Sequence, residues 1–292
     1  MQITYIDRHT GEIKHENPPA EGLLNALYHN PFGKMALLPL VKRKFISEFY
    51  GRSMKSPSSV NRIEEFVQKM GIDMSESLKP IDAFGSFNEF FHRELKPEAR
   101  PIGSNLVSPG DGRLLAFESV KEIHNFFVKG REFTLPEFLD NEELAAKHQD
   151  DVLIILRLAP NDYHRFHFPY AGTPGPIQRI KGSYYSVSPY ALAGNFTKVF
   201  CENKREYCLL DTPDKGEIVI APVGATMVGS IIETYQPNRP VRKGDEMGYF
   251  EFGGSTIVML VDRNKVSIDE DILANTRNKM ETFVKMGETI GA

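Results

Sequence analysis

The periodicity of the apolar residues changes near residue 100, and this change most constrains the fold. Before it, apolar residues recur at helical spacing, as in residues 62–70, which end at Gly71. After Pro97–Pro101, short apolar and β-branched runs follow one another between Gly and Pro residues. These runs are residues 112–118, 152–158, 217–221, 226–235, 248–252 and 256–261. The sequence predicts an α+β fold, in which an N-terminal helical segment packs on a mostly antiparallel β domain.

Local signals give the domain limits and two further helices. The helical region is expected at residues 1–95 and the β-rich catalytic domain at 96–292. Ser86 and Glu89 have the spacing of a capping box, which starts a short helix that must stop before Pro97. A helical insertion, residues 135–148, interrupts the β runs. The sequence contains neither an internal repeat nor a flexible linker, so the two regions are expected to pack together.

The composition limits the class of protein. Of 292 residues, 41% are apolar and 25% are charged, which is a globular composition rather than a disordered one. A net charge of −4 argues against nonspecific electrostatic binding of nucleic acid. Two cysteines, Cys201 and Cys208, are too few for a disulfide framework. No run approaches the roughly 18 apolar residues of a spanning helix, and the first ten residues lack the pattern of a secretory signal.

Basic residues gather in one segment. Residues 31–61 hold six Lys or Arg against one Glu, whereas the remainder of the chain is acidic. Wound as a helix, five of its apolar residues fall on one arc: Leu38, Val41, Phe45, Ile46 and Phe49. Two interpretations stay open. The helix docks on the protein's own core, or it is a monotopic anchor drawn to anionic lipid.

Two segments place a reactive side chain beside turn residues. In residues 108–113, Pro and Gly mark a turn that holds Asp111 at the start of a predicted strand, which by itself also fits a hairpin turn. In residues 248–261, Ser255 follows two glycines between two predicted strands, where a bulge or tight turn is the ordinary interpretation. A strand follows Ser255, so the segment is not the strand-turn-helix elbow of a Gly-x-Ser-x-Gly nucleophile.

A third segment, residues 161–169, carries His164 and His167 among aromatic residues, directly after the run 152–158. Two histidines three residues apart could serve as an acid and a base, with pKa values tuned by burial. Such a pair could also begin a metal site, but no Cys or acidic cluster with zinc-like spacing follows, so no metal is expected. Surface histidines without a role are the alternative interpretation.

Together with further motifs in the same order, these segments resemble the phosphatidylserine decarboxylases, pyruvoyl-dependent enzymes that make phosphatidylethanolamine. The resemblance runs from Pro31 to the C-terminus, and the Gly-Gly-Ser-Thr form is similar to the longer bacterial branch. The motifs that carry it are Ser108-Pro-Gly-Asp-Gly112, Asp162-Tyr-His-Arg-Phe-His-Phe168, Gly182-Ser-Tyr-Tyr-Ser-Val187, Val223-Gly-Ala225, Val228-Gly-Ser-Ile231, Lys243-Gly-Asp245 and Gly253-Gly-Ser-Thr256.

The resemblance implies a cofactor made from the chain itself. Loss of carbon dioxide from an amino acid leaves a carbanion, for which no ordinary side chain is an adequate electron sink. In this family a serine hydroxyl attacks the preceding carbonyl and the chain is cut, here between Gly254 and Ser255. Gly254 suits the attack because it has no Cβ to obstruct it. The β chain (1–254) and the α chain (255–292) stay associated, and Ser255 becomes a covalent pyruvoyl group.

The same resemblance implies roles for the reactive side chains. The family's arrangement gives His167, oriented by Asp111, as the base for Ser255, forming a self-cleavage triad. The amine of phosphatidylserine then forms a Schiff base with the pyruvoyl ketone, carbon dioxide leaves and phosphatidylethanolamine results. His164 is the candidate for handling the proton at the substrate carbon. Spacing alone does not tell which histidine ring faces Ser255.

The implied substrate bears on the basic segment. Phosphatidylserine is anionic and stays in the bilayer, so an enzyme without a spanning helix must dock on the surface. We therefore expect the N-terminal region to dock peripherally on the cytoplasmic face of the cell membrane, as a hypothesis that rests on charge and amphipathicity. The number of protomers stays open, a homodimer included.

Three other functions fit parts of the sequence. A serine hydrolase would use Ser255, His167 and Asp111 on an external ester and would leave the chain uncut. A carrier module is suggested by residues 241–245, a hairpin similar in pattern to biotinyl or lipoyl domains, but the modifiable lysine between methionines is missing. A pyruvoyl-dependent decarboxylase of another amino acid is nearer, and the lipid-specific motifs argue against it.

Overall fold

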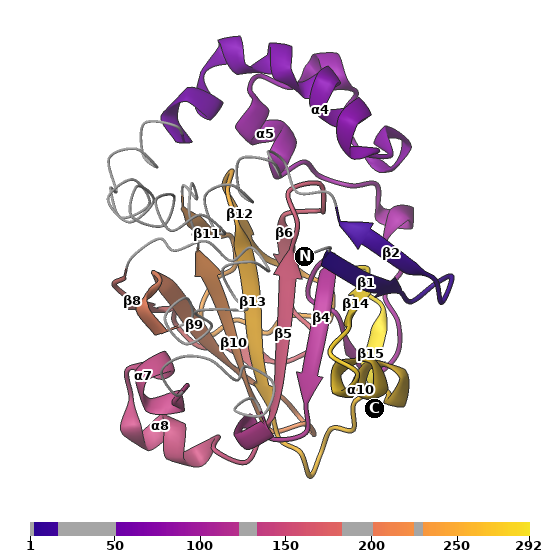
Figure 1. Ribbon diagram of the computed structural model, residues 1–292. Helices are drawn as coiled ribbons and strands as arrows, with labels where there is room; N and C mark the ends of the chain where they lie inside the picture. Colours follow the sequence, from indigo (N-terminus) through magenta and orange to yellow (C-terminus); the bar gives the residue numbers. More distant parts are fainter. Residues whose placement is uncertain (1–2, 17–50, 123–132, 183–200, 225–229) are drawn as a thin grey trace, which may run out of the picture.

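A large mixed sheet forms the centre of the molecule (Figure 1). The computed structural model describes residues 3–16, 51–122, 133–182, 201–224 and 230–292. Within them the main sheet has the strand order β2-β1-β14-β4-β5-β13-β10-β9-β7, and β8 also pairs with β9. The strands are β1 (Ile3–Asp7), β2 (Ile13–Glu16), β4 (Gly112–Phe117), β5 (Val152–Leu158), β7 (Thr173–Pro174), β8 (Gln178–Ile180), β9 (Arg205–Asp211), β10 (Glu217–Gly224), β13 (Ser255–Val261) and β14 (Glu281–Val284).

Two smaller sheets accompany the main sheet. One has the order β11-β12-β6 and the other pairs β15 with β3. Their strands are β3 (Leu106–Val107), β6 (Arg165–His167), β11 (Ile231–Glu233), β12 (Glu246–Phe250) and β15 (Thr289–Gly291). Among the strand pairs of the described residues, β1 with β14 is parallel and the others are antiparallel. The α+β prediction, with its mostly antiparallel β domain, is confirmed.

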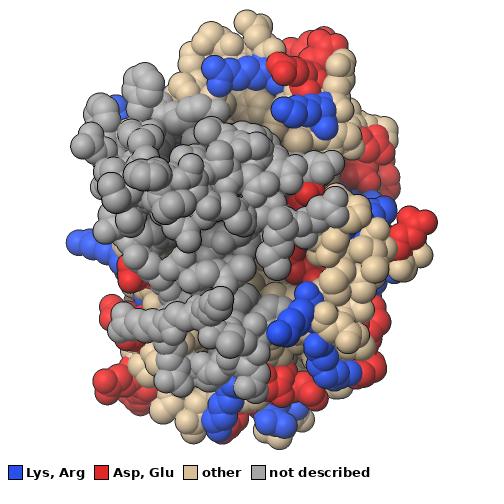
Figure 2. Space-filling view, in the orientation of Figure 1, with Lys and Arg blue, Asp and Glu red and all other residues tan. Residues whose placement is uncertain are grey.

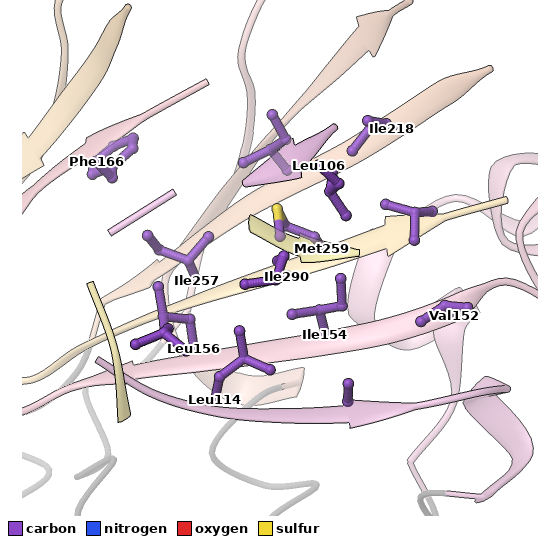
Figure 3. Close-up of a cluster of buried hydrophobic side chains, with 14 of the residues drawn as sticks. Leu106, Leu114, Val152, Ile154, Leu156, Phe166, Ile218, Ile257, Met259 and Ile290 are labelled. Carbon is purple, nitrogen blue, oxygen red and sulfur yellow. The ribbon is translucent and has the colours of Figure 1, made fainter. Parts of the chain in front are cut away.

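Both faces of the central strands are buried, which explains why these strands read as continuous apolar runs. Because successive side chains alternate between faces, one cluster takes every second residue of each strand. Figure 3 shows this cluster, in which Leu114, Ile154, Leu156, Ile257 and Met259 pack with Leu106, Phe166 and Ile290 of the smaller sheets. The opposite face packs against the helices after residue 133 through Leu115, Leu153, Ile155, Val258, Leu260, Phe138 and Leu139.

The helices lie around the sheet. They are α4 (Ile63–Met70), α5 (Phe87–Phe91), α7 (Leu135–Leu139), α8 (Glu142–Lys147) and α10 (Glu270–Arg277), with 3-10 turns at Pro57–Arg62, Met74–Glu76, Ile81–Ala83, Pro97–Ala99 and Val120–Glu122. In Figure 1, α4 and α5 cap one end of the sheet, and α7 and α8 lie near the other end. The cap has its own core, formed by Met54, Ile63, Phe84, Phe87, Phe90 and Phe91.

The predicted helices of the cap and the insertion are present. Helix α4 ends at Gly71, whose φ of +63° is the left-handed conformation that favours glycine. Helix α5 is capped by the hydroxyl of Ser86, which accepts from the backbone N–H of Glu89 at 3.1 Å. The insertion is split in two, because Asp140 adopts a φ of +50° and Asn141 then caps α8.

The prediction of a helical region over residues 1–95 is wrong at its start. Residues 3–16 form the hairpin β1–β2, which joins the main sheet beside β14. The Asp7 carboxylate accepts from the backbone N–H groups of His9 and Thr10, and Gly11 has a φ of +70°, so this tight turn closes the hairpin. Strand β1 is stabilised by β14, about 275 residues away, which no local pattern reveals. The amphipathic segment 38–49 lies outside the described residues.

The described residues contain no helix that is long and apolar enough to cross a membrane. On the face seen in Figure 2, basic and acidic side chains are interspersed over the described surface around the grey region. Most of the basic segment 31–61 falls within residues 17–50, so its predicted docking role stays a prediction.

Candidate active site

Ser255 stands where the chain passes from a small sheet into the main sheet. Residues 251–254 connect β12 to β13, so the Gly-Gly segment is a crossover between sheets rather than a hairpin turn. Ser255 is the first residue of β13 and is paired with Leu158 of β5 and Gly224 of β10. It is 0% exposed. The serine therefore begins an interior strand of the main sheet, paired on both sides.

The crossover is tied to the helical cap. The Phe252 ring packs against that of Phe91, with centroids 5.0 Å apart, and its backbone N–H donates to Asn88 Oδ1 at 2.8 Å. The buried Glu251 carboxylate pairs with Lys55 at 2.5 Å. At Gly253 a φ of +149° gives a backbone that side-chain-bearing residues rarely adopt. Because both sheets and the cap fix this loop, the bond between residues 254 and 255 is held in one place.

His164 is the histidine that contacts the serine. Its Nδ1 lies 3.1 Å from Ser255 Oγ, and both side chains are fully buried. The imidazole stacks on the ring of Phe91, with centroids 3.8 Å apart and planes 16° from parallel. The open question of which ring faces Ser255 is thus answered, for this uncut chain, in favour of His164.

Burial holds the His164 ring neutral. Desolvation shifts its pKa well below the usual value, the charge of Arg93 adds to the shift, and the carbonyls of Ala159 and Pro160 only partly oppose it. A neutral imidazole has one nitrogen that accepts a proton. With Nδ1 facing the Ser255 hydroxyl, the ring can take the serine proton as a base.

His167 is engaged elsewhere. Its Nδ1 lies 2.9 Å from the carbonyl of Gly244, which can only accept, so Nδ1 carries the hydrogen. Its Nε2 lies 3.0 Å from the hydroxyl of Tyr163, which therefore donates to it. Desolvation lowers the pKa of His167 as well. Both ring nitrogens are occupied, and neither is bonded to Ser255.

Asp111 forms a strong pair with an arginine rather than a bond to either histidine. Arg100 donates to it from Nε at 2.9 Å and from Nη2 at 2.5 Å, and the backbone N–H of Met286 donates at 2.8 Å. Both side chains are buried. Asp111 still acts electrostatically on His167, whose pKa it raises slightly against the effect of burial. The predicted triad is therefore not hydrogen-bonded as a unit in this structure.

The fold nonetheless brings the three predicted segments side by side. The backbone N–H of His167 donates to the carbonyl of Pro109 at 2.8 Å, which joins the Asp111 turn to the histidine segment. The backbone N–H of Phe250 donates to the carbonyl of His164 at 2.9 Å, which joins the histidine segment to β12. Segments more than 50 residues apart in sequence thus meet around one serine.

Sequence reasoning missed what α5 and the residues after it contribute. Phe91 covers His164, His92 stacks on Tyr249 with centroids 4.3 Å apart, and Arg93 lies close enough to lower the pKa of His164. The available signal was the run of aromatic and basic residues at the end of a short helix. Such a run also fits an ordinary packed helix.

The described residues hold no group of three or more potential metal ligands. They do hold a buried serine, a neutral histidine on it, and a glycine before it. This set can transfer an acyl group, either from an external ester or from the chain's own Gly254 carbonyl.

Comparison with known proteins bears on this choice. The family model described as phosphatidylserine decarboxylase matches residues 87–292. The chain is 54% identical over 293 residues to a protein of Fusobacterium nucleatum, covering 99% of this chain and 97% of the relative. It is 43% identical to one of Clostridium botulinum and 44% identical to one of Desulfitobacterium hafniense, each covering 99% of this chain and 98% of the relative. All three relatives are named phosphatidylserine decarboxylase proenzyme.

Proposed function

The chain belongs to the phosphatidylserine decarboxylase family, and from this premise we propose that it cuts itself before Ser255 and then converts phosphatidylserine to phosphatidylethanolamine. The observation that carries the proposal is the contact of His164 Nδ1 with Ser255 Oγ at 3.1 Å, directly after Gly254. Ser255 is 0% exposed and directly follows Gly254, so in the uncut chain the acyl group beside its hydroxyl is the carbonyl of its own peptide bond.

His164 begins the cleavage as a base. It takes the Oγ proton while Oγ attacks the carbonyl carbon of Gly254, and it returns a proton to the Ser255 nitrogen as the peptide C–N bond breaks. The chain is then joined by an ester. Loss of the Ser255 α-proton expels the Gly254 carboxylate and leaves a dehydroalanine, and water then releases ammonia to give the pyruvoyl group.

This proposal moves the first proton transfer from His167, where the resemblance placed it, to His164. His167 and Asp111 stay in the proposed machinery as positioning residues. Asp111 holds the turn whose Pro109 carbonyl accepts from His167, and His167 holds Tyr163, the neighbour of His164. If loss of the His167 ring stopped cleavage while loss of the His164 ring did not, the assignment by resemblance would stand instead.

The fold supports a cut enzyme whose chains stay together. The α chain would contribute β13 to the middle of the main sheet, between β5 and β10 of the β chain. It would also contribute β14, between β1 and β4, and β15, which pairs with β3. Separation would break every one of these ladders, so we propose a processed enzyme that remains one folded unit.

The residues around Ser255 fit a pyruvoyl group. The position is enclosed, since Ser255 and His164 are both 0% exposed, and Phe91 stacks on the ring. A pyruvoyl group supplies a carbonyl that holds the substrate amine and accepts the electron pair left by carbon dioxide. His164 lies at this position and can deliver a proton to the substrate carbon, which is the role that the family resemblance implies for it.

The test is direct. Purified protein mixed with vesicles of phosphatidylserine is expected to form phosphatidylethanolamine and carbon dioxide in equal amounts, and S255A is expected to form neither. If the chain stayed uncut and Ser255 reacted with a fluorophosphonate, a serine hydrolase would be the better description.

We also propose peripheral docking on the cytoplasmic face of the membrane through the basic segment, which the sequence alone supports. Deleting residues 1–50 would remove β1 and β2 from the main sheet, so a charge reversal is the cleaner test. Changing Lys42, Arg43 and Lys44 to Glu should weaken co-sedimentation with anionic vesicles and leave self-cleavage unchanged. Undiminished binding would reject the docking role.

A further inference from the structure

Arg93 differs from the other buried arginines of the described residues. Those others are Arg100, Arg113, Arg157 and Arg205. Three of them pair with carboxylates, and the fourth donates three hydrogen bonds of 2.6–2.9 Å to backbone carbonyls. Arg93 is 6% exposed, yet its one hydrogen bond to a described residue, from Nη2 to the carbonyl of Asn161, is 3.4 Å long, and its Nε has no partner among those residues. Its donors are therefore largely unused.

The carboxylates near Arg93 are committed to other cations. The charges of Asp111 and Asp162 both raise the pKa of Arg93 against the effect of burial, but neither carboxylate forms an ion pair with it. Asp111 is held by Arg100, and Asp162 is held by Arg113. One face of the guanidinium lies over an aromatic ring, 5.2 Å from the centroid of Phe90, which leaves the N–H edge as the polar side.

Arg93 acts electrostatically on the histidine that contacts Ser255, whose pKa its charge lowers. It follows Phe91, the residue that stacks on His164, by two positions. Its hydrogen-bond partner Asn161 precedes His164 by three positions. By contrast Arg165, which lies between the two site histidines, is bonded to Glu94, Glu246 and the carbonyl of His92. The cation between the histidines is thus structural, and the unpaired one comes from the cap.

A buried cation without a counter-charge is costly, and a bound anion would offset that cost. The planar fork of arginine matches the two oxygens of a carboxylate or a phosphate. We propose that Arg93 binds an oxyanion of the substrate headgroup, its carboxylate or its phosphate, next to the reaction centre. This inference rests on the proposed function, because it takes phosphatidylserine as the substrate.

The experiment compares wild type with R93Q and R93K, with R277Q as a matched control in an exposed arginine of α10. Steady-state rates on phosphatidylserine in mixed micelles give KM and kcat separately. R93Q should raise KM by about tenfold to a hundredfold, the effect of a lost charge-assisted hydrogen bond. R93K keeps the charge but not the planar fork, so its KM should fall between those of wild type and R93Q. R277Q should have the KM of wild type.

Inhibition by phosphatidylethanolamine, which has the phosphate but lacks the carboxylate, identifies the bound group. If R93Q weakens this inhibition as much as it raises KM, Arg93 binds the phosphate. If inhibition is unchanged while KM rises, Arg93 binds the carboxylate.

A wild-type KM in R93Q would overturn the proposal. Should R93Q fail to mature, a wild-type KM in R93K would overturn it. The proposed function fails separately, by absence of activity in wild type itself.

Discussion

Two clusters of buried ionisable side chains differ in how their members are partnered. The first, here called the paired cluster, consists of Glu16, Arg113, Arg157 and Glu281. Arg157 donates to Glu281 at 2.6 and 2.9 Å and to Glu16 at 2.7 and 3.0 Å. The second, the open cluster, consists of His92, Arg93 and His164, each of which has a buried ring or guanidinium nitrogen without a partner.

Burial of charge is therefore not in itself a sign of function in this protein. The paired cluster links strands β2, β4, β5 and β14, and it spans both chains of the proposed cut enzyme. In the open cluster His164 contacts the serine, and the charges of Arg93 and His92 lower the pKa of His164. What distinguishes the open cluster is a missing counter-charge: Arg113 and Arg157 each have ion-pair partners, whereas Arg93 forms no ion pair within the described residues.

The largest expected effect is on cleavage in the open cluster. H164A removes the ring that contacts Ser255, and general-base catalysis is worth about 10²- to 10⁴-fold in rate, so the chain should stay uncut for days. The readout is the fraction of cut chain on a denaturing gel over time. H15A, in an exposed histidine of β2, should cut like wild type. Normal cutting of H164A would contradict the proposed base.

The next effect is on stability in the paired cluster. R157M leaves the Glu281 carboxylate without its cation and leaves Glu16 with Arg113 alone, which should cost about 3–5 kcal/mol in the free energy of unfolding. Urea denaturation of the uncut S255A background, with and without R157M, measures it in a single chain. A loss below about 1 kcal/mol would show that the cluster is more hydrated than its burial indicates.

Much of the fold could be predicted from the sequence because its strands are buried on both faces. The predicted and observed limits of strand β5 (Val152–Leu158) are the same, and those of β4 and β13 differ by one residue. The hairpin β1–β2 was missed, since its partner β14 lies at the other end of the chain. Strand pairing over such distances leaves no local signal.

The motifs predicted which segments come together around Ser255 but not which side chains touch there. Asp111, His164, His167 and Ser255 do converge, and the motifs indicated this. Which histidine touches Ser255 depends on ring orientation, and the link between Asp111 and Arg100 depends on tertiary packing. The unpaired state of Arg93 is also a tertiary property, because sequence shows a charge but not the absence of its partner.

A smaller effect is expected with pH. The pKa values of His164 and His167 lie below their usual value in the folded chain, so in acid the unfolded chain binds more protons than the folded one. Stability should therefore fall as pH drops below about 6.5, the unfolded value. Self-cleavage should be level from pH 7 to 8, because His164 is already neutral there. In S255A, adding H164A should flatten the acid side of the stability curve; an unchanged slope would contradict the shift.

The smallest effect is expected at an exposed pair. Lys121 and Asp150 lie 2.7 Å apart with side chains 70% and 56% exposed. Water screens such a pair, so K121M should change the free energy of unfolding by less than about 1 kcal/mol. Measured in the same denaturation series as R157M, the K121M value shows how little an exposed ion pair contributes compared with the buried pairs of Arg157. A loss equal to that of R157M would remove the distinction between buried and exposed pairs.

The central claim is that His164 activates Ser255 to cut the chain, and an intact mass spectrum under denaturing, reducing conditions tests it most directly. Wild type should give two species, one ending at Gly254 and one beginning at residue 255 that is lighter by the mass of ammonia than a serine-initiated fragment. H164A should give one species at the full mass of 33.0 kDa. A single uncut species from wild type after prolonged incubation, or two species from H164A, would contradict the account.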